Sequence, residues 1–245
     1  MPAFRSAVEG YGADMLELDV RLSSDGRVVV IHDATVDRTT DGSGAVGDLP
    51  WSALRALDAG CRFKAEDGAI GFSGGRTEMP LLDDVLEAFP HMRLNVEAKC
   101  SEVAEPLVKR IRAHDAVHRV LVAAEHEANR RRIRGYRGPW GASRRQLRPF
   151  VLLHDTPVGF LYTPAVDALQ VPESWQGRTI VSEAFLREAH RRNIPVHVWT
   201  VDDPEAMRRL LSMGVDGIQT DRPDRLAQVL HEERGRPLPP ALAAA

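Results

Sequence analysis

Two acidic residues near the start of the chain have the type and spacing of metal ligands. Glu17 and Asp19 lie in the run Leu16-Glu17-Leu18-Asp19-Val20. If this run is a β-strand, alternation places both carboxylates on one face and the apolar side chains on the other. Neighbouring carboxylates repel each other, and a hard cation such as Mg²⁺ or Ca²⁺, which takes oxygen ligands, relieves that repulsion. Solvated charges paired with arginines are the alternative that this pair alone leaves open.

A third carboxylate and a lysine occur together at the end of a second apolar run. Glu97 and Lys99 lie two positions apart in Leu94-Asn95-Val96-Glu97-Ala98-Lys99, and hence on one face of a strand. Polar residues at the C-terminal ends of barrel strands converge on the active-site mouth. We therefore expect Glu17, Asp19 and Glu97 to hold one divalent cation. Lys99 would be either their counter-ion or a contact for a phosphoryl oxygen.

His32 is the candidate group for proton transfer. It follows the β-type run Val28-Val29-Val30-Ile31, shortly after the carboxylate pair. A histidine side chain exchanges protons near neutral pH, so beside a cation and a phosphodiester it can act as general acid or base. A half-buried imidazole in a capped turn is the alternative for this residue.

The elements that must position these groups alternate between apolar β-type runs and amphipathic helical stretches. This pattern is typical of a parallel sheet with crossover helices. Asp203 before Pro204 predicts the start of one such helix, and Gly214 predicts its end. The predicted strands are residues 14–20, 93–99, 120–124, 139–142, 167–171, 195–201 and 216–220.

Residues 33–80 interrupt this alternation, because turn-forming residues such as those of Thr39-Thr40-Asp41-Gly42-Ser43-Gly44 are frequent there. We expect this stretch to be an insertion in a single barrel domain spanning residues 1–233, followed by a flexible tail at 234–245. The seven predicted strands are one fewer than a closed parallel barrel requires. We therefore expect the first barrel strand to be missing from the chain.

Composition limits the classes of function. The 245 residues and the 43% hydrophobic content suit one globular domain, since an α/β barrel has roughly 250 residues. The net charge of −3 argues against nucleic-acid binding, and the arginine-rich run Arg130-Arg131-Arg132 is interpreted as a solvated helix face. No apolar run approaches the ~20 residues of a membrane span.

Ordered motifs along most of the chain resemble the glycerophosphodiester phosphodiesterase family. The resemblance covers residues 2–230 and is specific as an ordered set rather than motif by motif. The matching segments are Gly12-Ala13-Asp14-Met15-Leu16-Glu17-Leu18-Asp19-Val20, Asp25-Gly26, Val30-Ile31-His32-Asp33, Asp37-Arg38-Thr39-Thr40-Asp41-Gly42-Ser43-Gly44, Val96-Glu97-Ala98-Lys99, Val196-His197-Val198-Trp199-Thr200-Val201-Asp202 and Gly214-Val215-Asp216-Gly217-Ile218-Gln219-Thr220-Asp221-Arg222-Pro223.

The resemblance implies an α/β fold, a TIM-type (β/α)8 barrel with a small insertion after the second family strand. It also implies metal ligation by the three carboxylates, His32 as one of two catalytic histidines, Lys99 on the substrate phosphate and Trp199 on the pocket wall. Without the resemblance, packing in the core would be the alternative role for Trp199. The implied reaction is metal-dependent hydrolysis of glycerophosphodiesters to glycerol 3-phosphate and an alcohol.

Two other functions remain open on the same residues. One is a phospholipase D-like lysophospholipid or sphingomyelin phosphodiesterase, and the other is a non-catalytic barrel remnant that binds a metal or an anion. The resemblance places a first strand with His-Arg-Gly, followed by Pro-Glu-Asn-Thr, before the position of Met1. We therefore expect the activity of this chain to be impaired. We expect a cytoplasmic location unless a signal peptide lies upstream, and the sequence assigns no oligomeric state.

Overall fold

The computed structural model describes residues 1–64, 68, 70–72 and 74–243. The chain divides into two compact units, one formed by residues 1–4 and 15–138 and the other by residues 5–14 and 139–245. Parts of the predicted insertion (residues 65–67, 69 and 73) and the end of the predicted tail (244–245) lie outside the described residues. No helix among the described residues has both the length and the apolar character to cross a bilayer.

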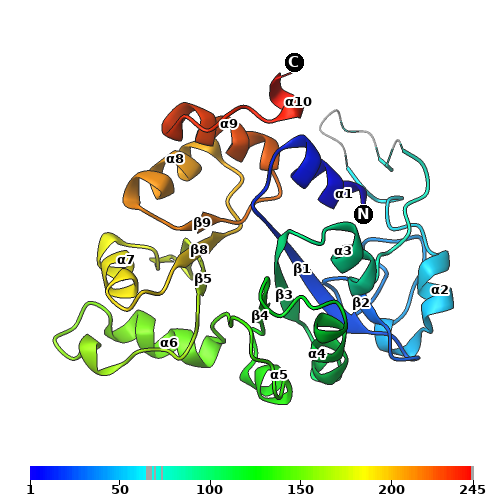
Figure 1. The fold of residues 1–245 in the computed structure, drawn as a ribbon, viewed down its shortest axis with the longest axis horizontal. Helices are drawn as coiled ribbons and strands as arrows, with labels where there is room; N and C mark the ends of the chain where they lie inside the picture. Colours follow the sequence, from blue (N-terminus) through cyan, green and yellow to red (C-terminus); the bar gives the residue numbers. More distant parts are fainter. Residues whose placement is uncertain (65–67, 69, 73, 244–245) are drawn as a thin grey trace. The chain divides into compact units, whose positions relative to one another are not determined.

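The first unit is built on a four-stranded sheet in the order β2-β1-β3-β4 (Figure 1). Strands β1 (Met15–Leu22), β3 (Arg93–Ala98) and β4 (Val120–Ala123) run parallel, whereas β2 (Val28–Val30) pairs antiparallel with the end of β1. Along β1 and β3 the apolar side chains alternate with polar ones and are buried on one face, whereas all four residues of β4 are apolar and buried. Its helices are α2 (Trp51–Ala56), α3 (Leu82–Ala88), α4 (Ala104–Ala113) and α5 (Glu127–Arg132), with α1 (Pro2–Arg5) at the start of the chain.

The segment between β2 and α3 has a small core of its own. Val36, Val46 and Leu54 pack there with the end of β2, and each is at most 1% exposed. The segment contains η2 (Val46–Asp48) and isolated antiparallel bridges, Thr35 with Ala45 and Lys64 with Ile70. This core fixes the loop that follows His32.

The second unit contains the parallel strands β5 (Leu169–Pro172), β8 (Val196–Trp199) and β9 (Gly217–Ile218) in the order β5-β8-β9, with the hairpin β6 (Ser174–Trp175) and β7 (Arg178–Thr179). In Figure 1, α8 lies beside α9. Its helices are η1 (Ser6–Gly10), α6 (Arg144–Leu153), η3 (Gly159–Leu161), α7 (Glu183–His190), α8 (Pro204–Met213), α9 (Pro223–Arg234) and α10 (Pro240–Ala243).

The ends of α8 confirm the prediction from the sequence. The Asp203 carboxylate accepts a hydrogen bond of 2.9 Å from the Ala206 N–H, which satisfies one of the free donors of the first turn. Pro204 occupies the first turn, where its missing N–H costs nothing. Gly214 ends the helix at φ 92°, a left-handed conformation that glycine adopts without strain.

Six of the seven predicted parallel strands form, and the segment 139–142 is reduced to one parallel bridge between Gly141 and Ala168. This segment is short and contains proline, which cannot donate to a ladder, and glycine, which weakens a strand. The C-terminal segment makes defined contacts: Arg236 forms two 2.7 Å hydrogen bonds with Asp14. The predicted single domain, the flexibility of 234–245 and the strand before Met1 stay predictions.

Candidate active site

Three carboxylates meet where β1 and β3 pair. Asp19 and Glu97 are direct partners in the parallel ladder, and Glu17 precedes Asp19 by two residues on the same face of β1. One ligand oxygen from each lies within 4.8 Å of the others. The opposite face of β1 is apolar and buried, so the alternation of the sequence fixes the direction of both of its carboxylates.

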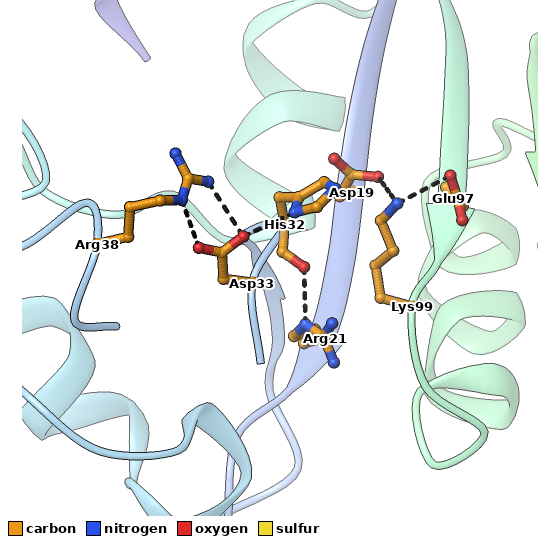
Figure 2. Close-up of polar contacts among 7 residues, drawn as sticks. All are labelled: Asp19, Arg21, His32, Asp33, Arg38, Glu97 and Lys99. Atoms are coloured by element: carbon orange, nitrogen blue, oxygen red, sulfur yellow. Dashed lines mark hydrogen bonds and ion pairs between the residues drawn. The ribbon is translucent and has the colours of Figure 1, made fainter. Parts of the chain in front are cut away.

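Lys99 lies between two of these carboxylates. Its Nζ is 3.0 Å from Asp19 Oδ1 and 3.0 Å from Glu97 Oε2, and its side chain is 15% exposed (Figure 2). Burial by itself would lower the pKa of Lys99, but the attraction of Glu97 and Asp19 outweighs burial and raises the pKa above its ordinary value. Lys99 is therefore protonated at neutral pH.

The donor set suits a hard divalent cation. Oxygen ligands lie about 2.3–2.6 Å from Ca²⁺, so oxygens on opposite sides of one ion are about 5 Å apart, which matches the spread of this cluster. With all four groups ionised, the three carboxylates and the Lys99 ammonium leave a formal charge of −2. One divalent ion would balance that charge, and Glu17, Asp19 and Glu97 are the residues that could hold it.

Hydrogen bonds to backbone carbonyl oxygens hold His32 beside strand β1. The Ile31 N–H donates to the Asp19 carbonyl oxygen at 2.9 Å, which fixes His32 one residue beyond this link. Arg21, two residues after Asp19, donates from Nε to the His32 carbonyl oxygen at 2.9 Å. The imidazole is 62% exposed and hence accessible to a substrate.

Asp33 and Arg38 orient the imidazole of His32 (Figure 2). Arg38 donates to both oxygens of Asp33 at 2.6 and 3.0 Å, and His32 Nδ1 lies 2.7 Å from Asp33 Oδ1. The hydrogen bond from Arg38, followed by that from His32, lowers the pKa of Asp33 well below its ordinary value. An ionised carboxylate only accepts, so His32 Nδ1 carries the proton of this hydrogen bond, and in the neutral form of the ring Nε2 presents a lone pair. This imidazole can take a proton at Nε2.

Sequence reasoning identified His32 but gave Asp33 and Arg38 no role. The signal was present in His32-Asp33, where a carboxylate adjacent in sequence can reach the imidazole. The contact between Arg38 and Asp33 depends on the conformation of the loop that connects these two residues, and Thr40 stabilises that loop. This residue is fully buried, and its hydroxyl donates to the Val36 carbonyl oxygen at 2.7 Å.

Trp199 lies in the second unit, at the last position of β8, and is 38% exposed. Its neighbours on the strand, Val196 and Val198, are fully buried. The indole is therefore not part of the core that these valines form, which argues against core packing. Its predicted place on the substrate pocket stays a prediction.

Three carboxylates and a protonated lysine along the parallel pair β1 and β3, with an oriented imidazole just after β2, are an arrangement that suits an α/β enzyme able to join a bound cation to a proton-transfer group. The model of the glycerophosphoryl diester phosphodiesterase family matches residues 1–225. The chain belongs to this family of phosphoric diester hydrolases.

Relatives match nearly the whole chain. The "Probable glycerophosphodiester phosphodiesterase 2" of Mycobacterium tuberculosis is 35% identical, with 94% of this chain and 84% of that protein covered. A glycerophosphodiester phosphodiesterase of Caldanaerobacter subterraneus is 32% identical over 94% of this chain and 90% of its own length. Lysophospholipase D GDPD1 of Rattus norvegicus is 24% identical over 94% of this chain and 81% of its own.

Solved structures share the fold. The glycerophosphoryl diester phosphodiesterase domain of a Mycobacterium tuberculosis protein has a TM-score of 0.77 at 19% identity, covering 94% of this chain and 92% of that one. An Oleispira antarctica phosphodiesterase, solved with its product sn-glycerol-3-phosphate, has a TM-score of 0.72 at 21% identity, covering 93% and 90%.

Proposed function

We propose that this protein hydrolyses glycerophosphodiesters to glycerol 3-phosphate and an alcohol with the help of one divalent cation, Mg²⁺ or Ca²⁺. The observation that carries the proposal is the convergence of Glu17, Asp19 and Glu97 within 4.8 Å on the paired parallel strands β1 and β3. Membership of the family and the product bound to the Oleispira antarctica relative support this substrate class.

Each group has a separate role in this reaction. The cation, when bound, offsets negative charge on the phosphoryl oxygens and on the attacking hydroxyl. Lys99 holds a phosphoryl oxygen with its ammonium. His32 Nε2 accepts the proton of the glycerol hydroxyl as that oxygen attacks phosphorus, while Asp33 keeps Nδ1 protonated. The P–O bond to the alcohol breaks as the predicted second histidine donates a proton to the leaving oxygen, and water then opens the cyclic phosphodiester.

The rest of the substrate pocket and the complete barrel belong to the same proposal. We infer a (β/α)8-type barrel, supported by the solved relatives that match 93–94% of the chain. Trp199, at the C-terminal end of β8, would line the substrate pocket, as the family resemblance implies. The second catalytic histidine and the cytoplasmic location stay predictions.

Release of glycerol 3-phosphate from glycerophosphocholine tests the proposal. Activity should disappear with a chelator and return with Mg²⁺ or Ca²⁺. Glu97→Gln should weaken cation binding in titration calorimetry and abolish turnover. Glu78→Gln is the matched control, because Glu78 lies in an exposed pair with Arg55. Cation binding without hydrolysis would favour a non-catalytic metal-binding barrel, and unchanged activity of Glu97→Gln would refute the metal site.

A second candidate substrate, a lysophospholipid, is favoured by one observation. Phe63 and Ile70 in the segment after β2 are 55% and 72% exposed, and Phe63 packs edge-on against Phe72 with 6.3 Å between ring centroids. Exposed apolar side chains of this kind suit an acyl chain. Comparing turnover of lysophosphatidylcholine with that of glycerophosphocholine, in wild type and Ile70→Ser, separates the two: only lysophospholipid hydrolysis should depend on Ile70.

A further inference from the structure

Asn95 is a buried amide on the same face of β3 as Glu97. Its side chain is directed to this face by alternation, because Leu94 and Val96 are fully buried on the other face. Its direct partners across the ladder are Glu17 on β1 and Leu121 on β4. It therefore lies beside one carboxylate of the cluster and two residues before another.

The side-chain carbonyl oxygen of Asn95 is buried and unsatisfied among the described residues. Asn95 is 3% exposed, and its Oδ1 has no hydrogen-bond partner among the described residues. A buried polar atom without a partner costs stability, and most such atoms in folded proteins are satisfied by protein or water. Leucine, the residue at the neighbouring position 121, would fill a similar space at no such cost. The amide thus carries a cost that the cation-free fold does not offset.

We propose that Asn95 supplies an uncharged oxygen to the cation bound by Glu17, Asp19 and Glu97, either directly or through one water ligand of that ion. The inference rests on the proposed function. Hard cations take six or more oxygen ligands and readily accept amide carbonyls among them. A neutral donor also leaves the formal charge of the site at −2, which one divalent ion balances. Asn95 therefore contributes an oxygen to the cation site and is not a proton-transfer group.

Cation binding measured apart from catalysis tests this role. Ca²⁺ and Mg²⁺ are titrated by calorimetry into the wild type, Asn95→Leu and Leu121→Met, and thermal unfolding is followed with chelator and with each ion. Asn95→Leu should weaken cation affinity about 10- to 100-fold, the range for outer partners of metal ligands. It should melt at or above the wild-type temperature in chelator. Leu121→Met, which changes packing beside Asn95 without changing polarity, should bind as the wild type does.

Asn95→Asp keeps the oxygen and the size of the side chain, so it is the second test variant, to be used if Asn95→Leu does not fold. It should bind the cation at least as tightly as the wild type and be less stable in chelator, because a fourth carboxylate then lies among like charges. Weaker binding by Asn95→Asp, or wild-type affinity in Asn95→Leu, would overturn the role of Asn95 alone. A wild type that binds neither ion would overturn the proposed function itself.

Discussion

Replacing Lys99 by methionine should expose how strongly the acidic cluster depends on a cation. The Lys99 ammonium contacts Asp19 and Glu97 at 3.0 Å each, and all three side chains are at most 20% exposed. Methionine keeps much of the apolar stem but removes the positive charge. Asp19 and Glu97 then lose the ammonium that lies between their carboxylates.

The cost follows from these distances. At an effective dielectric constant of about 20, each contact at 3.0 Å has a gross attraction of about 5 kcal/mol, most of which is offset by desolvation of the charges. Removing one partner of a mostly buried pair costs about 3–5 kcal/mol, and the partial exposure here lowers this to about 2–4 kcal/mol. Without a cation, Lys99→Met should lose that amount of unfolding free energy.

Urea unfolding in chelator and in saturating Ca²⁺ measures the effect. We expect the variant to regain most of the lost stability with Ca²⁺, because the ion supplies the charge that the ammonium supplied, and to bind the ion more tightly than the wild type. Turnover should stay low in Ca²⁺, since Lys99 also holds the phosphate in the proposed reaction. Lys109→Met, on an exposed position of α4, is the control and should change neither quantity.

Equal stability of Lys99→Met and the wild type in chelator would show that the contacts at 3.0 Å contribute nothing net. A loss of stability that Ca²⁺ does not restore would show that no cation occupies the cluster. Either result would refute the electrostatic reasoning for this site.

Three further predictions concern single side chains. Asp33→Asn should lower kcat/KM by about tenfold or more in a pH–rate profile, because Nδ1 of His32 loses its ionised acceptor. The fold also lowers the pKa of Asp33, so the stability that this carboxylate contributes should be present above about pH 4 and should be lost as the pH falls towards the lowered pKa. Acid unfolding of the variant and the wild type measures this difference. Asp203→Ala should cost about 1 kcal/mol in thermal unfolding by removing the cap of α8, with turnover unchanged. Trp199→Leu should raise KM about fivefold with little change in kcat, as expected for about 1 kcal/mol of aromatic contact with substrate; an unchanged KM would place the indole outside the pocket.

Features that depend on local periodicity and capping could be predicted from the amino-acid sequence alone. Alternation in the run from Leu16 to Val20 fixed Glu17 and Asp19 on one strand face, because successive side chains of any strand point to opposite sides. Asp203 and Gly214 marked the ends of α8 because their side-chain and backbone chemistry acts within one helical turn. The ordered motifs also gave the family, since many short matches in one order rarely arise by chance.

Tertiary structure decided which distant residues meet. The register that pairs Asp19 with Glu97 and Glu17 with Asn95 results from the packing of whole strands, and a shift of one residue would have separated the carboxylates. The approach of Arg38 to Asp33 depends on a loop held by buried side chains. Among the described residues Asn95 Oδ1 has no hydrogen-bond partner, and this depends on every group that packs around it. Such relations are non-local, because they are set by the packing of segments far apart in the chain, so no window of sequence contains them.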